Sequence, residues 1–375
     1  MATVSSLLLV FFSYLLNNSP LFTGENLPCF ALAEWTRSHF VQETEEENVV
    51  YINTAYDRQL VPYREDGFEM GNTDITDRHK LLQLLQLLQQ TNYRYIFMDI
   101  RFEQGCESED PAIDSLLFAQ IDSMPHIVLV QHRDVQNMAG VPTRKMAYND
   151  YYATITATNF VRYQFLMGDR QTMPLYAFRE MTGDSIKRHM GLFYTSAGHL
   201  CYNSLFLTFS PEEQATGSLN LMGRYILQDE KPLTRLSQMV DGKLVVIGDL
   251  THDLHDTYSG MHAGGEMLAS AVRALLDHRH LVNGWRAFFL FCLYLVLSLV
   301  MFTPKRWYEY IPLLQRIQFP VLGFVLSFIG YSTVLMGISF FLGLFFRTYV
   351  TFLLPSLWFS FFSSYVSFKK ENKRK

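Results

Sequence analysis

The last quarter of the chain contains three long apolar segments, and these constrain the fold more than any other feature of the 375-residue sequence. They cover Trp285–Phe302, Phe319–Phe346 and Thr348–Phe368, and Arg286 is their only charged residue. A helix needs about 20 predominantly apolar residues to cross a bilayer. A buried core helix explains one such segment, but not three in close succession. The sequence therefore predicts a helical transmembrane region over residues 284–368, with spans near 285–302, 319–346 and 348–368.

The distribution of charge separates this region from the rest of the chain. Residues Thr23–Asn283 carry 34 acidic and 21 basic side chains, a net charge of −13. Residues Gly284–Lys375 carry 2 acidic and 10 basic side chains, a net charge of +8. Because the basic excess lies in an apolar region, it does not indicate nucleic-acid binding. The content of 49% apolar and 18% charged residues excludes a disordered chain.

Basic residues lie at alternate ends of the apolar segments. Lys305, Arg306 and Arg316 separate the first from the second, and the tail 369–375 is basic, whereas only Arg347 separates the second from the third. Cytoplasmic connections carry an excess of Lys and Arg. The first connection and the C-terminal tail are therefore expected in the cytoplasm, and residues 23–283 outside it.

Export of residues 23–283 requires an N-terminal signal, and residues 1–22 are the candidate. The stretch Leu7–Leu16 is interrupted only by polar Ser13. It is either a signal anchor that extends to Phe22 or the apolar core of a signal peptide, with Ala31-Leu32-Ala33 as a candidate cleavage site. Both interpretations leave the acidic part of the chain outside the cytoplasm.

Strand and helix signals alternate in this exported part. We expect strands and helices, in chain order, at Asn48–Asn53 (strand), Asp77–Gln90 (helix), Tyr95–Ile100 (strand), Ala112–Ile121 (helix), Ile127–Gln131 (strand), Lys243–Gly248 (strand) and, after a polar loop, Glu266–Asp277 (helix). The middle is more antiparallel in character, with extended segments at Tyr152–Phe165, Leu192–Phe209 (broken at Ser196-Ala197-Gly198) and Asn220–Leu227. The order predicts an α/β domain with a mostly parallel mixed sheet.

Short motifs near the end of this domain follow one another in a recognisable order. They are Gly242–Gly248, Asp253–Thr257, Gly260-Met261 and Gly265-Glu266 with Ala269, preceded upstream by Val49–Ile52, Tyr95–Phe102 and Thr158–Val161. Together with the three apolar segments, this order resembles CHASE sensor domains of the second type, which are extracytoplasmic domains associated with cyclases and histidine kinases. The resemblance covers roughly residues 27–366.

The resemblance implies a bacterial receptor in the inner (plasma) membrane that binds a small-molecule or envelope ligand. The family's turn before its first helix is reduced to a Gly and a late Arg in Gly71–Arg78, and Leu268 replaces the family's His. After Phe368 only the short basic tail follows, so a separate output protein is the expected partner. The resemblance also allows a homodimer. The alternatives are a membrane scaffold that holds partner proteins and an exported metal-dependent enzyme.

Polar residues cluster after the strand Lys243–Gly248. They are Asp249, His252, Asp253, His255, Asp256, His262 and Glu266. Three interpretations stay open: a structural loop with local hydrogen bonds, a small-ligand site, or a transition-metal site. No spacing matches a helical zinc motif, so no metal ligand is assigned. The ligand-binding candidates are Asp253, His255 and Thr257, joined by Asp99 because it lies near a strand end at the same predicted sheet edge.

Other signatures of catalysis are missing from the sequence. It contains no nucleophile elbow, phosphate-binding loop, dinucleotide fingerprint or Cys-x-x-Cys pair, so we expect no enzyme and no cofactor. Cys29, Cys106 and Cys201 lie outside the predicted membrane region and Cys292 within it. A Cys106–Cys201 bridge is possible, but the sequence does not determine the pairing.

Overall fold

The computed structural model describes residues 1–19, 25–40, 48–150, 162–209, 221–303, 320–347 and 349–374. The chain divides into two compact units. The first contains residues 1–43, 153–161 and 281–375, and the second contains residues 44–152 and 162–280. Each unit is described by itself.

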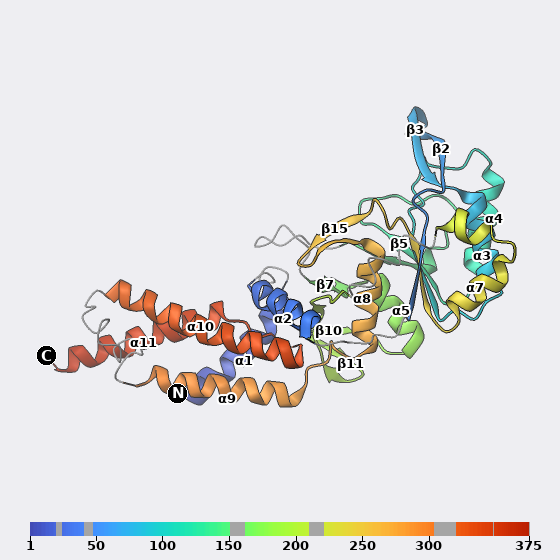
Figure 1. Cartoon of the computed structure of the whole chain (residues 1–375). Coiled ribbons are helices and arrows are strands. Elements are labelled where there is room, and N and C mark those ends of the chain that lie inside the picture. Colours follow the sequence, from blue (N-terminus) through green and yellow to red (C-terminus); the bar gives the residue numbers. More distant parts are fainter. Residues whose placement is uncertain are drawn as a thin grey trace. The chain divides into compact units, whose positions relative to one another are not determined.

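A five-stranded parallel sheet organises the second unit (Figure 1). Its strands, in spatial order, are β1 (Val49–Asn53), β14 (Leu244–Gly248), β4 (Tyr95–Asp99), β5 (Ile127–Gln131) and β6 (Met146–Tyr148). All four pairings are parallel. The mostly parallel sheet is thus confirmed, but it is not mixed, because the antiparallel pairs form separate small sheets.

Helices cover both faces of this sheet. Helices α3 (Arg78–Leu88), α4 (Pro111–Ser123) and α7 (Pro232–Val240) lie on one face, and α5 (Met173–Thr182) and α8 (Gly264–Leu276) on the other (Figure 1). The main core cluster joins alternate strand residues such as Ile52, Met98 and Ile247 to the leucines of α3. These leucines recur at helical spacing, and Asp77 accepts a hydrogen bond from the Lys80 amide as the helix cap. The predicted helices at 77–90, 112–121 and 266–277 are therefore confirmed.

A hairpin that the sequence analysis did not predict projects from the second unit (Figure 1). Its strands are β2 (Arg58–Glu65) and β3 (Phe68–Thr76). The turn residues Asp66 and Gly67 have φ of 49° and 83°. Asp-Gly is the dipeptide that a two-residue hairpin turn with two positive φ angles favours, so a local signal was present.

The predicted strand Asn220–Leu227 is wrong for its described part. Residue 220 lies outside the described residues, and Met222–Leu227 form a π-helical turn, η3. This turn buries Met222 and Ile226 in the core. The Gly223 amide donates a hydrogen bond to Asp57 at 2.8 Å, and a Cβ on Gly223 would come within 2.1 Å of that carboxylate. The side chain of Asp57 thus holds the backbone in the turn where an extended strand was expected.

The predicted extended segments in the middle form short antiparallel strands. β10 (Lys187–His189), β11 (Phe193–Ser196) and β12 (His199–Leu200) make one sheet, and β13 (Ser204–Leu205) pairs with β7 (Tyr163–Gln164). The break at Ser196-Ala197-Gly198 is confirmed, with positive φ at Ala197 and Gly198. Of the predicted segment Tyr152–Phe165, residues 152–161 lie outside the described residues, as do the basic residues Lys305, Arg306 and Arg316 and the motif Thr158–Val161.

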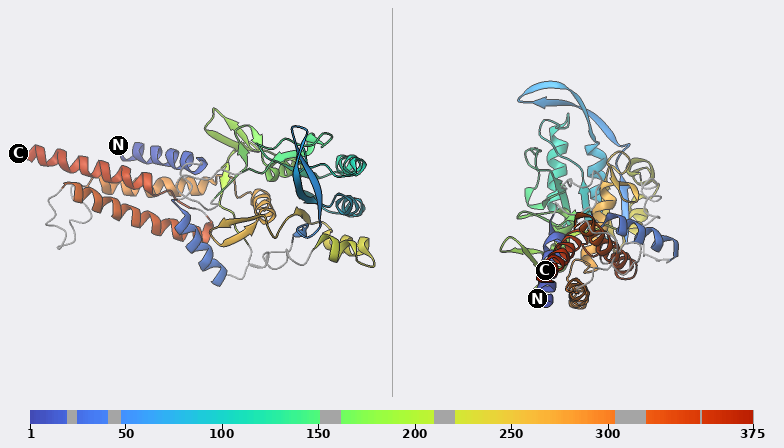
Figure 2. Two further views of the ribbon diagram at one scale, coloured as in Figure 1. Left: turned by 90° about the horizontal axis from the view of Figure 1, so that it is seen from above. Right: turned by 90° about the vertical axis from the view of Figure 1, so that its left-hand side faces the viewer.

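The first unit consists of helices, shown from two further directions in Figure 2. Within the described residues they are α1 (Ala2–Asn18), α2 (Leu27–Phe40), α9 (Gly284–Met301), α10 (Pro320–Phe346) and α11 (Leu353–Arg374). Two helical stretches, Gly284–Met301 and Val321–Phe346, are long and apolar enough to cross a membrane. The third predicted span is helical only from Leu353 onward and does not reach the same hydropathy.

Candidate functional site

Three strands of the parallel sheet end side by side at one edge. Asn53 of β1, Gly248 of β14 and Asp99 of β4 are in register across the sheet. A Cβ on Gly248 would lie only 3.2 Å from the Cβ and the carbonyl oxygen of Asp99, so glycine fits this position closely. The carboxyl ends of parallel strands are where open α/β sheets usually bind ligands.

The residues after β14 form a turn held by local hydrogen bonds and then a hairpin, where the sequence predicted a polar loop. Asp249 accepts hydrogen bonds from the amides of Thr251 (3.0 Å) and His252 (2.8 Å) and pairs with Arg58. Asn53 accepts from the Leu250 amide at 3.2 Å. A hairpin of β15 (Leu254–Thr257) and β16 (Gly260–Ala263) then leads directly into α8. The polar side chains of the first turn therefore fix its shape.

The structure brings Asp99 and Asp253 together at the first residue of α8. A Cβ built on Gly264 would lie 2.5 Å from Asp253 Oδ2 and 3.3 Å from Asp99 Oδ2, so both carboxylates approach the same backbone position. The Gly264 amide donates to the Asp253 carbonyl oxygen at 3.0 Å. His255 Nε2 lies 3.3 Å from Asp253 Oδ1. Three of the four predicted site residues thus form one cluster.

The environment raises the pKa of two members of this cluster. Burial, and then the neighbouring Asp253 carboxylate, raise the pKa of Asp99 to about 7, with Asn149, Arg101 and His255 opposing the change. The hydrogen bond to Asp253 raises the pKa of His255. Both shifts favour bound protons: burial and a second carboxylate disfavour ionised Asp99, whereas the Asp253 carboxylate favours the protonated form of His255.

Thr257, the fourth predicted residue, lies elsewhere. Asp253 precedes β15, whereas Thr257 pairs with Gly260 at the opposite end of the hairpin. The Thr257 hydroxyl donates to the Gly260 carbonyl at 2.8 Å and accepts from the Ser259 amide at 3.3 Å. These bonds close the hairpin turn, which is the structural interpretation that the sequence left open for this residue.

Two residues complete the cluster that the sequence analysis did not select. Asn149 follows β6 at the same edge, and its Nδ2 lies 3.5 Å from both carboxylate oxygens of Asp99. Tyr163 donates its hydroxyl to Asn149 Oδ1 at 3.2 Å. Burial raises the pKa of Tyr163, which keeps it a neutral donor. A prediction of β6 would have identified Asn149 as a strand-end residue.

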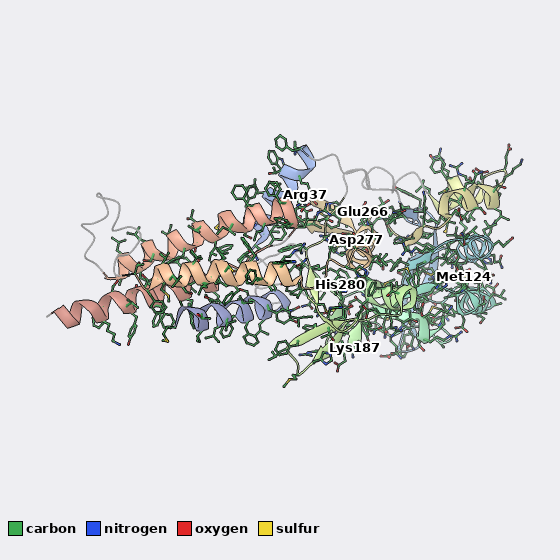
Figure 3. All side chains as sticks on the ribbon, turned by 90° about the horizontal axis from the view of Figure 1, so that it is seen from below. Arg37, Met124, Lys187, Glu266, Asp277 and His280 are labelled. Atoms are coloured by element: carbon green, nitrogen blue, oxygen red, sulfur yellow. The ribbon has the colours of Figure 1, made fainter. Side chains whose placement is uncertain are left out.

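His262 and Glu266 are buried within a second hydrogen-bonded chain, at the start of α8. Glu266 (Figure 3) lies 2.9 Å from His262 Nδ1 and accepts from the Ala263 amide at 3.3 Å. His262 Nε2 contacts the Ser259 hydroxyl at 2.8 Å, and its ring stacks on Phe209. This chain ties the turn of the β15–β16 hairpin to the first turn of α8.

Metal binding and disulfide formation receive no support from the described residues. Within them, no group of three or more His, Cys, Asp or Glu side chains is placed to hold a metal ion. All four cysteines are described and free, so the Cys106–Cys201 bridge is not formed. Cys106 packs with Val61 and Ile75 beneath the β2–β3 hairpin, while the Cys201 amide donates to the Tyr194 carbonyl beside β12.

The family model described as "CHASE2 domain" matches residues 39–303. No curated protein matches, and no solved structure matches.

Proposed function

The chain belongs to the CHASE2 domain family, a family of sensory domains, and we propose that it is a membrane-anchored extracytoplasmic sensor that binds a ligand at the Asp99–Asp253–His255 cluster. The observation that carries the ligand site is the convergence of Asp99 and Asp253 on Gly264.

The chemistry of the cluster favours a ligand that supplies positive charge or hydrogen-bond donors. Asp99 and Asp253 present carboxylate oxygens, and His255 and Asn149 add donors beside them. A cationic group placed between the carboxylates would remove their mutual repulsion, and that repulsion is one cause of the raised pKa of Asp99. Such a ligand would bind better where Asp99 is ionised.

Helix α8 is the proposed route for the signal. It begins at Gly264, against the two carboxylates, and the chain continues from its end to α9 through residues 277–283. A ligand changes such a system only through its different affinities for two conformations. A ligand that draws Asp99 and Asp253 together acts on the first turn of α8, and we propose that this change is passed on to the membrane helices.

Membrane anchoring and a separate partner complete the proposal. The two stretches Gly284–Met301 and Val321–Phe346 support anchoring by length and composition. CHASE2 domains are extracytoplasmic sensors, which supports the outside location of the second unit. The basic tail 369–375 is the reason for proposing a cytoplasmic C-terminus. A sensor needs an output, and we propose a separate signalling protein that contacts the membrane helices.

The test is a thermal-shift screen of the full chain in lipid nanodiscs against a panel of small cationic and polar molecules. Asp253→Ala removes one carboxylate of the cluster, and Asp256→Ala is the matched control because Asp256 is an exposed residue of the same hairpin. We expect a ligand that stabilises the wild type and Asp256→Ala but not Asp253→Ala. A ligand that stabilises all three equally would show that the site lies elsewhere.

A further inference from the structure

The β10–β11 hairpin of the second unit presents an apolar side chain at an unusual backbone position. Residues 190 and 191 form its turn, and the Leu192 amide donates to the His189 carbonyl at 3.1 Å. Met190 has φ of 50° and Gly191 has φ of 74°. Gly, Asn and Asp tolerate a positive φ in such turns, whereas a long apolar side chain adopts it at a cost in backbone free energy.

Among the described residues, Met190 is also the most exposed large apolar side chain, at 91%. Leu192 on the same turn is 50% exposed. An exposed methionine contributes nothing to the core, and its unfavourable backbone conformation motivates the search for a function. We therefore expect the tip of this hairpin to contact an apolar partner.

Basic side chains lie on the strand that leads into this apolar tip. Lys187, Arg188 and His189 form the exposed strand β10. The sequence contains no acidic residue from Ser185 to Phe209, although Thr23–Asn283 as a whole has a net charge of −13. An apolar tip flanked by basic side chains is the combination that binds an anionic lipid surface.

The end of β11 opposite the tip contacts His280, which precedes the apolar helix α9 in the chain. The His280 carbonyl accepts a hydrogen bond from the Tyr202 amide at 2.7 Å. The Nε2 atom of the His280 ring lies 3.0 Å from the Ser196 hydroxyl at the end of β11. His280 and Lys187 of this region are labelled in Figure 3. Only three residues separate His280 from Gly284, the first residue of α9, so their Cα atoms are at most about 14 Å apart.

We propose that the β10–β11 tip is a membrane-surface contact, in which Met190 and Leu192 enter the interface and Lys187 and Arg188 bind anionic lipid headgroups. The inference rests on the proposed anchoring of α9 in the membrane. It adds a second, peripheral attachment of the second unit to the membrane. Arg188 donates to the Gly191 carbonyl at 2.9 Å, so one of the two cations also holds the turn that displays Met190.

Oxidation of methionine by hydrogen peroxide tests this contact in the unmodified full chain. The protein is placed in nanodiscs of phosphatidylcholine alone or mixed with phosphatidylglycerol, and oxidation rates are measured by mass spectrometry. Met70, which is 63% exposed on β3, is the internal control. We expect Met190 to be oxidised more slowly than Met70 in the anionic discs, and faster in the neutral discs than in the anionic ones.

Lys187→Gln removes one headgroup contact and leaves the turn intact. We expect it to weaken the contact by about fivefold, as one basic residue at an anionic surface does, and so to raise the Met190 rate. Lys231→Gln, an exposed lysine before α7, is the matched control and should change nothing. Equal oxidation rates at Met190 and Met70 in every disc would overturn the proposed membrane contact. Equal protection of Met190 in neutral and anionic discs would overturn the role of anionic headgroups. Failure of the chain to enter nanodiscs would instead contradict the anchoring.

Discussion

Asp99 and Asp253, which are far apart in the sequence, direct one carboxylate oxygen each toward the first residue of α8, at 3.3 and 2.5 Å from the position of a Gly264 Cβ. The sheet places Asp99, and the turn held by Asp249 places Asp253. The pair places a carboxyl group whose charge depends on pH, that of Asp99, beside the start of α8. This arrangement can be tested by changing the pH, by substituting Gly264, and by substituting residues that follow α8 in the chain.

Asp99→Asn should remove a pH-dependent loss of stability. The pKa of Asp99 rises from 3.8 to about 7 on folding, so between these values the folded state holds a proton that the unfolded state lacks. Stability then falls as pH rises through this window, by roughly 1.4 kcal/mol for each pKa unit of the shift, and is level above it. Thermal unfolding of the full chain between pH 4 and 8 should show the asparagine variant to be the more stable protein at pH 8 and similar to wild type near pH 4. A variant that is less stable at pH 8 would contradict the burial of an ionised Asp99.

Gly264→Ala should separate the carboxylates from the helix. The added methyl group would overlap Asp253 Oδ2, and the exposed Asp253 side chain is the group that can move. We expect the variant to lose about 1 kcal/mol of stability, and Asp253 to lose its hydrogen bond with His255. Gly284→Ala is the control, because nothing lies within 4 Å of its Cβ position. The His255 ring signals in NMR spectra across pH would report the broken pair, as a lowered His255 pKa in the first variant and not in the second.

Much of this arrangement could be predicted because it rests on local pattern. The leucines at 81, 84, 85 and 88 repeat with helical spacing, and Leu244–Gly248 is an uninterrupted apolar strand, as expected for a strand covered on both faces. Asp99 and Asp253 could be selected because they follow such strands. The strand order, which places β14 between β1 and β4, is a long-range property that no local pattern contains.

The errors arose where one residue's tertiary contact decided the local structure. Met222–Leu227 has the composition of a strand, but Asp57 binds the Gly223 amide and the backbone turns there. Thr257 has a hydroxyl suited to a ligand, but its neighbours in the hairpin turn bind it. Asn149 was overlooked because β6 is only three residues long, too short for a periodic signal.

His280→Gln should weaken the response of the second unit to acid. His280 is fully buried, and burial lowers its pKa from 6.5 to about 4. A histidine with a depressed folded pKa takes up its proton more readily when unfolded, so stability falls as pH drops from about 6.5 to 4 and then levels off. Thermal unfolding of the wild type should follow this course, and the glutamine variant should show a smaller change across the same window. His189→Gln, an exposed histidine on β10, serves as the control. Parallel pH curves for wild type and His280→Gln would contradict a neutral His280.

Polar side chains join α1 to the other helices of the first unit. Ser13 Oγ lies 2.8 Å from the Tyr294 hydroxyl and accepts from Thr351 Oγ1 at 2.9 Å. Near the start of α1, the Trp358 indole donates to Ser5 Oγ at 2.7 Å. Leu9 is fully buried between these two points. A signal peptide that is cut off after translocation has no need of such contacts, whereas a retained anchor uses hydrogen bonds between helices in place of hydrophobic burial.

We therefore expect the N-terminal segment to remain in the mature protein as an anchor, which is one of the two alternatives that the sequence left open. The intact mass of the chain purified from membranes should include residues 1–33, and a mass that corresponds to a chain starting after Ala33 would contradict the prediction.

Tyr294→Phe removes the hydroxyl that contacts Ser13 and should lower stability by about 0.6 kcal/mol, the average for a hydrogen bond between membrane helices. Tyr365→Phe is the matched control, since Tyr365 is 54% exposed on α11 and its change should have no effect. If α1 packs as described, Ser13→Ala and Tyr294→Phe together should lower stability by less than the sum of the two single changes, because they share the bond between Ser13 and Tyr294, although Ser13→Ala also removes the bond from Thr351.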